Sequence, residues 1–216
     1  DGFIKRKKTR KIRIGNIFIG GDKPIAVQSM TNTDTRDVTA TINQIKRLED
    51  VGCDIVRVAV PDREAALAIK KIKKAIKLPL VADIHFDYRL AIASMENGAD
   101  KIRINPGNIG SEERVKQIVD LARTMDIPIR IGVNSGSVEK HIIEKYGGVT
   151  PEGMVESTIN NVRMLEKFNF DKIIISVKAS NVPMTIAAYR LISETLDYPL
   201  HLGVTEAGTP FRGTIK

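Results

Sequence analysis

The sequence contains a single cysteine, Cys53, among its 216 residues. One thiol excludes an internal disulfide, and it also excludes a metal cluster held by several thiolates of this chain. Cys53 precedes an apolar segment, where we expect it to pack as a small apolar residue. A chain without disulfides fits a reducing compartment, so we predict a cytoplasmic location.

Long apolar runs are also missing. No segment approaches the ~20 consecutive apolar residues of a membrane-spanning helix, and no apolar core follows the basic N-terminus as it does in a secretory signal. Hydrophobic residues make up 42% of the chain and charged residues 28%, a balance typical of globular proteins. We therefore expect one α/β domain without a membrane segment.

Positive charge is in excess, but most of this excess is local. The net charge is +8, and residues 1–13 contain seven basic residues and one acidic residue. The remaining chain therefore carries about +2. We expect the basic segment to be a solvated terminus and expect no nucleic-acid partner; the alternative is an arm that touches RNA or phosphate.

Short β-branched runs alternate with helical patterns from residue 24 onward. The runs cover 25–30, 55–60, 80–86, 101–106, 129–134, 172–179 and 200–206, and the helices cover about 38–51, 62–76, 88–97, 111–125, 151–168 and 183–196. Such alternation predicts parallel strands joined by crossover helices. Apolar runs on both sides of Gly15-Asn16 predict a β-hairpin, and we expect a glycine-rich surface loop around His141 and Tyr146.

A two-unit repeat favours a closed barrel. Four runs open with a proline and an aliphatic residue, and the three runs between them open with Asp54, Asp100 and Asp171. Alternate strands supply successive layers in a TIM (β/α)8 barrel, so we predict this fold, with a doubly wound open sheet as the alternative. We expect a basic tail and hairpin over 1–23, and over 24–216 a barrel domain with seven of its eight strands.

The two faces of the predicted strands differ in polarity. One face is aliphatic, from Ile25 and Val27 to Leu202 and Val204, and suits a covering layer of helices. The other face would point into the barrel. It consists of Gln28, Met30, Arg57, Asp83, His85, Arg103, Asn105, Arg130, Gly132, Asn134, Ser176, Lys178, His201, Gly203 and Thr205.

Four cations lie on the inward face, toward the carboxyl ends of the strands, where barrel enzymes carry out their chemistry. Burying Arg57, Arg103, Arg130 and Lys178 together is unfavourable unless opposite charge compensates them. Guanidinium groups bind phosphate oxygens in pairs, and a lysine adds a point charge. We therefore predict a diphosphate ligand, with purely structural ion pairs as the alternative.

Three further features suggest roles in chemistry. Asp83, His85 and Asp87 recur at every second position, which suits an acid–base group or, as the alternative, a divalent metal. Lys178 resembles the Schiff-base lysines of barrel aldolases, although we prefer diphosphate contact. Glu206 follows the seventh run and is a candidate general acid–base, with a helix-start carboxylate as the alternative.

Six sequence blocks, taken together and in order, point to one family. They are Val27–Asn32, Val81–Asp87, Arg103–Gly110, Arg130–Asn134, Ser176–Ser180 and Thr205–Gly208. With these blocks the chain closely resembles the bacterial 4-hydroxy-3-methylbut-2-enyl diphosphate synthases, from about residue 5 to residue 216. The resemblance implies a TIM barrel followed by a C-terminal domain, outside this chain, that holds a [4Fe-4S] cluster on three cysteines and a glutamate.

The resemblance also implies an activity and its partners. It implies an oxidoreductase of the non-mevalonate isoprenoid pathway, which reductively opens the ring of 2-C-methyl-D-erythritol 2,4-cyclodiphosphate and removes water. It further implies that flavodoxin or ferredoxin supplies the electrons and that the assembly is a head-to-tail homodimer. This chain contains none of the cluster cysteines, so we expect it to be inactive alone.

Site roles follow from the same resemblance, residue by residue. Arg57, Arg103, Arg130 and Lys178 look like the diphosphate clamp, Asn105 and Asn134 like further substrate hydrogen-bonding groups, and Asp83, His85 and Glu206 like residues that orient substrate or move protons. Three rival functions remain: a dihydropteroate-synthase-like barrel, a Schiff-base aldolase and a nucleic-acid-binding module that uses the basic tail.

Overall fold

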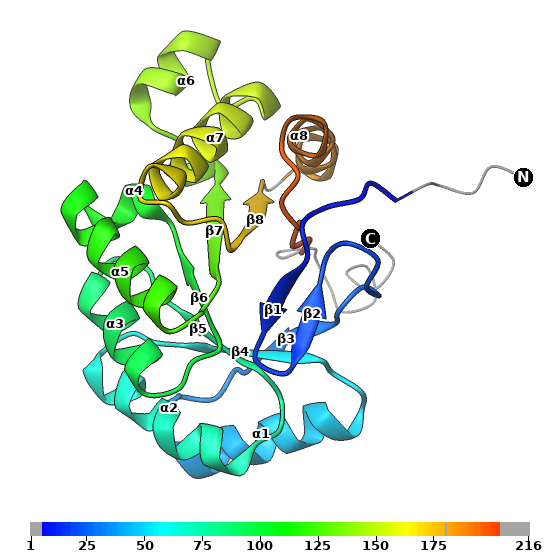
Figure 1. Ribbon diagram of the computed structural model, residues 1–216. Coiled ribbons are helices and arrows are strands. Elements are labelled where there is room, and N and C mark those ends of the chain that lie inside the picture. Colours follow the sequence, from blue (N-terminus) through cyan, green and yellow to red (C-terminus); the bar gives the residue numbers. More distant parts are fainter. Residues whose placement is uncertain (1–5, 180, 204–216) are drawn as a thin grey trace, which may run out of the picture.

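The computed structural model describes residues 6–179 and 181–203. Six parallel strands form one curled sheet in chain order (Figure 1). They are β3 (Gln28–Met30), β4 (Ile55–Ala59), β5 (Leu80–Asp83), β6 (Lys101–Ile104), β7 (Ile129–Asn134) and β8 (Ile173–Lys178). A doubly wound sheet reverses its strand order at a switch point, and this sheet does not. The predicted TIM-barrel fold is therefore confirmed over the described part of the chain.

The seventh predicted run is short where it can be followed. A single parallel bridge joins Ile175 of β8 to Leu200. Residues 204–206 of the run lie outside the described residues.

The six predicted helices are present and lie along the outside of the sheet. They are α1 (Val38–Asp50), α2 (Arg63–Ala75), α3 (Tyr88–Glu96), α5 (Glu112–Thr124), α7 (Pro151–Lys167) and α8 (Val182–Thr195). Three of them have an aspartate N-cap: the Asp62 carboxylate accepts from Ala65 N and that of Asp37 from Ala40 N, each at 2.9 Å, and Asp87 caps α3. No helix in the described ranges is both long and apolar enough to cross a membrane.

Three short helical segments were not predicted. They are α4 (Pro106–Ile109), the 3-10 turn η1 (Ser135–Ser137) and α6 (Lys140–Tyr146). The loop expected around His141 and Tyr146 is therefore wrong. Ile142 of α6 is fully buried, and Gly147 ends the helix in the left-handed conformation at φ 68°. A seven-residue helix with one buried side chain shows no repeating apolar positions, so helical periodicity cannot detect it.

The aliphatic strand face packs under the helices as predicted, except near the edges of the described sheet. Val56, Ile102 and Ile173 are fully buried in the main core. Ile25, Val27 and Leu202 contradict the prediction, because they are 78%, 58% and 70% exposed. The first two precede the edge strand β3, and Leu202 follows the isolated bridge, so no described helix covers these side chains.

The opening aspartates have a structural reason. Asp54 Oδ2 accepts a hydrogen bond from Val27 N at 2.7 Å, and Asp100 Oδ2 accepts one from Leu80 N at 2.7 Å. Each carboxylate thus satisfies a backbone N–H of the preceding strand at the amino end of the sheet, where no further strand residue is paired. Asp171 differs, since its carboxylate lies 3.6 Å from Arg10 at the surface.

The predicted hairpin closes the amino end of the sheet from inside (Figure 1). It consists of β1 (Ile12–Ile14) and β2 (Ile17–Ile19), which pair antiparallel around Gly15 at φ 55°. Ile12 and Ile14 pack against Ile55, Val81 and Ile174, which are inward-facing residues of three strands. The hairpin therefore acts as an apolar floor beneath the polar layer of the inward face.

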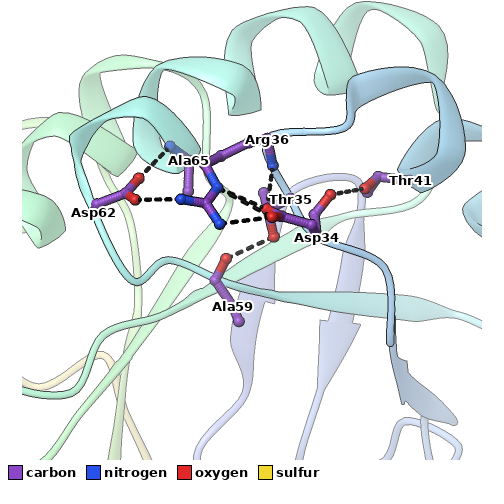
Figure 2. A network of polar contacts seen from close by, with 7 residues as sticks. All are labelled: Asp34, Thr35, Arg36, Thr41, Ala59, Asp62 and Ala65. Carbon is purple, nitrogen blue, oxygen red and sulfur yellow. Dashed lines mark hydrogen bonds and ion pairs between the residues drawn. The ribbon is translucent and has the colours of Figure 1, made fainter.

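Polar contacts bind the loop after β3 to the loop after β4 (Figure 2). Arg36 lies 2.6 Å from Asp34 and 3.0 Å from Asp62. The Thr35 hydroxyl donates to the Ala59 carbonyl at 2.6 Å. Both loops follow the carboxyl ends of their strands, so the network fixes this part of the rim.

The hairpin floor yields a stability prediction. Ile14→Ala should lower the free energy of unfolding by about 2–5 kcal/mol, because it opens a cavity between β1 and three barrel strands. Phe18→Ala, on the outer face of β2 and 44% exposed, is the control and should cost less than ~1 kcal/mol. Urea unfolding measures both free energies. Equal losses of stability in the two variants would contradict the proposed packing role of the hairpin.

Candidate active site

A cavity of about 390 Å³ opens at the carboxyl ends of the strands. Most of the residues that line it come from the predicted inward face. They are Gln28, Ser29, Met30, Arg57, Asp83, His85, Arg103, Arg130, Asn134, Ser176, Val177, Lys178, Tyr189, His201, Leu202 and Gly203. The structure thus brings together seven of the nine predicted site residues from five strands and the loop after β5.

Positive charge dominates this cavity. Asp83 is the one acidic side chain among the described residues that line it, and four cations face it. The Asp83 carboxylate lies 3.4 Å from Arg103 Nη1 and 3.7 Å from Arg57 Nε. Arg57 also donates to the Met30 thioether at 2.9 Å, a weak acceptor. One carboxylate cannot balance this set, so an anion would be stabilised here.

Buried guanidinium N–H groups strengthen the case for an anion site. Arg103 Nε and the Nε and Nη1 atoms of Arg130 are buried without a hydrogen-bond partner in the described ranges. Burial lowers the pKa of Arg130 to about 9, and the charges of Arg57 and Arg103 add to the effect. Arg130 is still cationic at neutral pH. An acceptor such as a phosphate oxygen would satisfy these donors.

A glycine makes room for one of these arginines. A Cβ placed on Gly132 would lie 2.6 Å from Arg103 Nε and 2.9 Å from Nη2. Gly132 is therefore required by the close approach of the guanidinium, rather than by its own backbone angles. The predicted inward face included this glycine, but only the structure gives its reason.

The other predicted site residues occupy three kinds of position. His85 Nε2 lies 3.9 Å from Asp83 Oδ2 in a half-exposed side chain, and Asn134 and Lys178 are register partners at the mouth. Asn105 is buried behind the lining: its Oδ1 accepts from Gly107 N at 3.2 Å, and its Nδ2 has no partner among the described residues. Glu206 lies outside the described residues.

Asp87 is separate from Asp83 and His85. Its carboxylate caps α3 by accepting from Arg89 N at 2.9 Å, and it pairs with Arg89 Nη2 at 2.8 Å. It is not part of the cavity lining, so the triplet is not a single group. Within residues 6–179 and 181–203, no cluster of three or more histidines, cysteines and acids could hold a metal ion.

Lys101 is a buried cation that was not among the predicted site residues. It lies one inward position below Arg103, is 1% exposed, and its Nζ donates to Gln28 Oε1 at 3.0 Å. Burial, together with the charges of Arg130 and Arg57, lowers the pKa of Lys101 well below its usual value. Lys101 is two residues from Arg103, so strand alternation places it on the same polar face. This spacing could have identified it as a cation of the inward face.

His201 and Tyr189 complete the wall of the cavity beside β8. Burial and the nearby charges of Arg130 and Lys101 lower the pKa of His201 to about 2, so the imidazole is neutral at physiological pH. Tyr189 comes from α8 in the helix layer, and no local sequence pattern indicates that a helix residue would reach the cavity.

The residues present do not fit an iron–sulfur cluster. Cys53 is the one cysteine of the chain, and its Sγ donates to the Ile55 carbonyl at 3.1 Å. It is buried at the amino end of β4, opposite the cavity. As predicted, it packs as a small buried residue.

Solved structures resemble the fold. A Plasmodium falciparum HPPK-DHPS structure with pterin and p-hydroxybenzoate has a TM-score of 0.67 at 10% identity, and covers 92% of this chain and 38% of that chain. A Xanthomonas albilineans dihydropteroate synthase structure has a TM-score of 0.64 at 16% identity, covering 88% and 74%. Identities this low show a shared fold alone.

Sequence relatives are much closer. The 4-hydroxy-3-methylbut-2-en-1-yl diphosphate synthase (flavodoxin) of Ruminiclostridium cellulolyticum is 68% identical over 213 residues, 99% of this chain and 60% of that protein. Its namesake from Caldanaerobacter subterraneus subsp. tengcongensis is 68% identical over 211 residues, 98% of this chain and 59% of that protein. The chain thus spans about 60% of the length of these relatives. The family profile of the GcpE TIM-barrel domain matches residues 9–216, and the chain belongs to this family.

Proposed function

We propose that this chain is the substrate-binding barrel of a 4-hydroxy-3-methylbut-2-enyl diphosphate synthase. The whole enzyme would convert 2-C-methyl-D-erythritol 2,4-cyclodiphosphate by reductive ring opening and loss of water. The observation that carries the proposal is the set of buried N–H groups of Arg103 and Arg130 that have no partner among the described residues, in a cavity whose described lining has one carboxylate. A cyclic diphosphate supplies both the negative charge and the acceptor oxygens that these donors lack.

The positions of the lining residues support different roles in holding the diphosphate. Arg57, Arg103 and Arg130 surround the floor side and would hold the diphosphate, with Lys178 as a point charge at the mouth. Asn134 lines the same mouth, whereas Asn105 would act from behind the lining through its free Nδ2. Fixing the diphosphate in this way would orient the carbon ring toward the opening.

Proton transfer would fall to the residues near the mouth. His85 is half-exposed beside Asp83, so it can exchange protons with solvent while the carboxylate orients it. We assign Glu206 to the same task by its place after the seventh run. A neutral His201 would add a hydrogen-bonding group without adding to the positive charge.

The redox part of the reaction would lie outside this chain. A [4Fe-4S] cluster supplies electrons one at a time to such a substrate, and a single buried cysteine cannot hold it. We therefore propose that the cluster, the electron donor and a head-to-tail partner subunit act on this cavity from elsewhere. The named relatives point to flavodoxin as the donor.

Arg103→Ala tests the proposed clamp. In the full-length protein, it should lower kcat/KM for the cyclodiphosphate by ~10²-fold or more, because it removes a buried charge that contacts the diphosphate in the transition state. Steady-state turnover with reduced flavodoxin measures this. Arg163→Ala, on the exposed face of α7, is the matched control and should leave the rate unchanged. Wild-type kinetics in Arg103→Ala would refute the assignment.

Gly132→Ala tests the packing of Arg103. The added methyl group would displace the guanidinium, so affinity for inorganic pyrophosphate should fall at least ~10-fold, about 1.4 kcal/mol. Titration calorimetry on the full-length protein gives the dissociation constant. Gly136→Ala is the control, because its added Cβ meets no atom within 4 Å. Similar affinities for the two variants would show that the close approach does not matter.

A further inference from the structure

β8 loses its neighbour on one side halfway along its length. Ile175 N donates to the Pro199 carbonyl at 3.0 Å, and His201 N donates to the Ile175 carbonyl at 2.7 Å. The next bond of a parallel ladder would run from Val177 N to the His201 carbonyl. That bond is absent from the described structure, and a tyrosine hydroxyl occupies its place.

The hydroxyl belongs to Tyr189 of α8. It accepts a hydrogen bond from Val177 N at 3.1 Å and donates one to the His201 carbonyl. Two hydrogen bonds in series thus replace one direct bond, so the seventh run is held away from β8 at this level. Tyr189 is buried, and burial raises its pKa, so the hydroxyl keeps the proton that it donates.

A second α8 side chain continues the substitution. Ala179 N, the next donor on this side of β8, donates to the Thr185 hydroxyl at 3.3 Å. Thr185 and Tyr189 are four residues apart and therefore lie on one face of α8. Two hydroxyl groups on this face of α8 accept the hydrogen bonds that carbonyls of a neighbouring strand would otherwise accept. The separation of residues 201–203 from β8 is therefore held by specific hydrogen bonds and is not fraying of the strand end.

The separation changes what lines the cavity. Val177 and Leu202 belong to the outward face of their strands, and Tyr189 to the helix layer, yet all three line the cavity with the inward-facing residues. They can do so because the sheet is open between β8 and residues 201–203. These residues lead directly to Thr205 and Glu206 in the sequence.

We propose that Tyr189 is a positioning residue, whose hydroxyl holds residues 201–203 away from β8 and so sets the place of His201 in the cavity. This role rests on the proposed synthase function. Tyr189 itself need not touch the substrate. The arginines come from β4, β6 and β7, whereas the Tyr189 hydroxyl bonds to Val177 of β8 and to His201, so diphosphate binding and turnover should separate in a Tyr189 variant.

Tyr189→Phe in the full-length enzyme is the test. Phenylalanine keeps the ring, and Val177 N can then pair directly with the His201 carbonyl. We expect kcat to fall at least ~10-fold, while KM for the cyclodiphosphate and the dissociation constant of pyrophosphate change less than ~3-fold. Hydrogen exchange of residues 199–203 should also change, which reports the geometry without any turnover.

Tyr198→Phe is the matched control. Its hydroxyl is also bonded to a distant residue, donating to Glu166 Oε1 at 2.7 Å, but it lies outside the ladder. It should leave kcat and the exchange of residues 199–203 unchanged. Unchanged kcat in Tyr189→Phe, or a joint loss of pyrophosphate binding and turnover, would overturn the positioning role. A wild-type enzyme that binds pyrophosphate but does not turn over the cyclodiphosphate would instead contradict the proposed function, and the exchange comparison would still decide the geometry.

Discussion

The charge imbalance inside the sheet is the constraint on which the rest of the structure depends. Arg57 and Arg103 pair with Asp83, and Arg130 lines the same cavity; Arg103, Arg130 and Asp83 are buried. Buried like charges repel each other and lose their hydration, so the fold must hold them in place against both costs. An apolar outer face under helices and an apolar hairpin floor hold the strands around them in place.

Packing and cavity lining fall to different residues of the sheet. The hairpin packs against the inward Ile55, Val81 and Ile174 at the amino end. Lys101 Nζ donates to Gln28 Oε1, and the arginines line the cavity at the carboxyl ends of the strands. The opening aspartates accept hydrogen bonds from backbone groups at the amino end. The residues that pack the amino end are therefore not those that line the cavity.

Much of this could be predicted from the sequence because period-two and helical patterns are local. The strand alternation placed Arg57, Arg103, Arg130, Asn134 and Lys178 on one face, and the structure finds them around one cavity. Errors arose where neighbours outside the pattern decide the outcome. Ile25 and Val27 are aliphatic like the core residues of the other strands. Their exposure depends on whether a helix packs over them, which the strand pattern does not specify.

Side-chain partners were also beyond the reach of patterns. Asp87 has the same spacing from His85 as Asp83, yet it caps α3, because the helix end offers N–H groups that the cavity does not. In the sequence, Gly132 is one more small residue of a predicted strand. The structure shows that the guanidinium of Arg103 packs against it. From the sequence, Tyr189 would be assigned to the core side of a helix. No local pattern reveals that the hydrogen-bond ladder between β8 and residues 201–203 is interrupted.

The sequence by itself determined the parallel α/β order, the apolar and polar strand faces, and the inward direction of the cations, since each follows from backbone periodicity. The tertiary structure alone decided which of those cations lack partners among the described residues, that a glycine admits Arg103, and that an α8 hydroxyl lies between β8 and His201. These features depend on distances between segments that are far apart in the chain, and no local pattern encodes such distances.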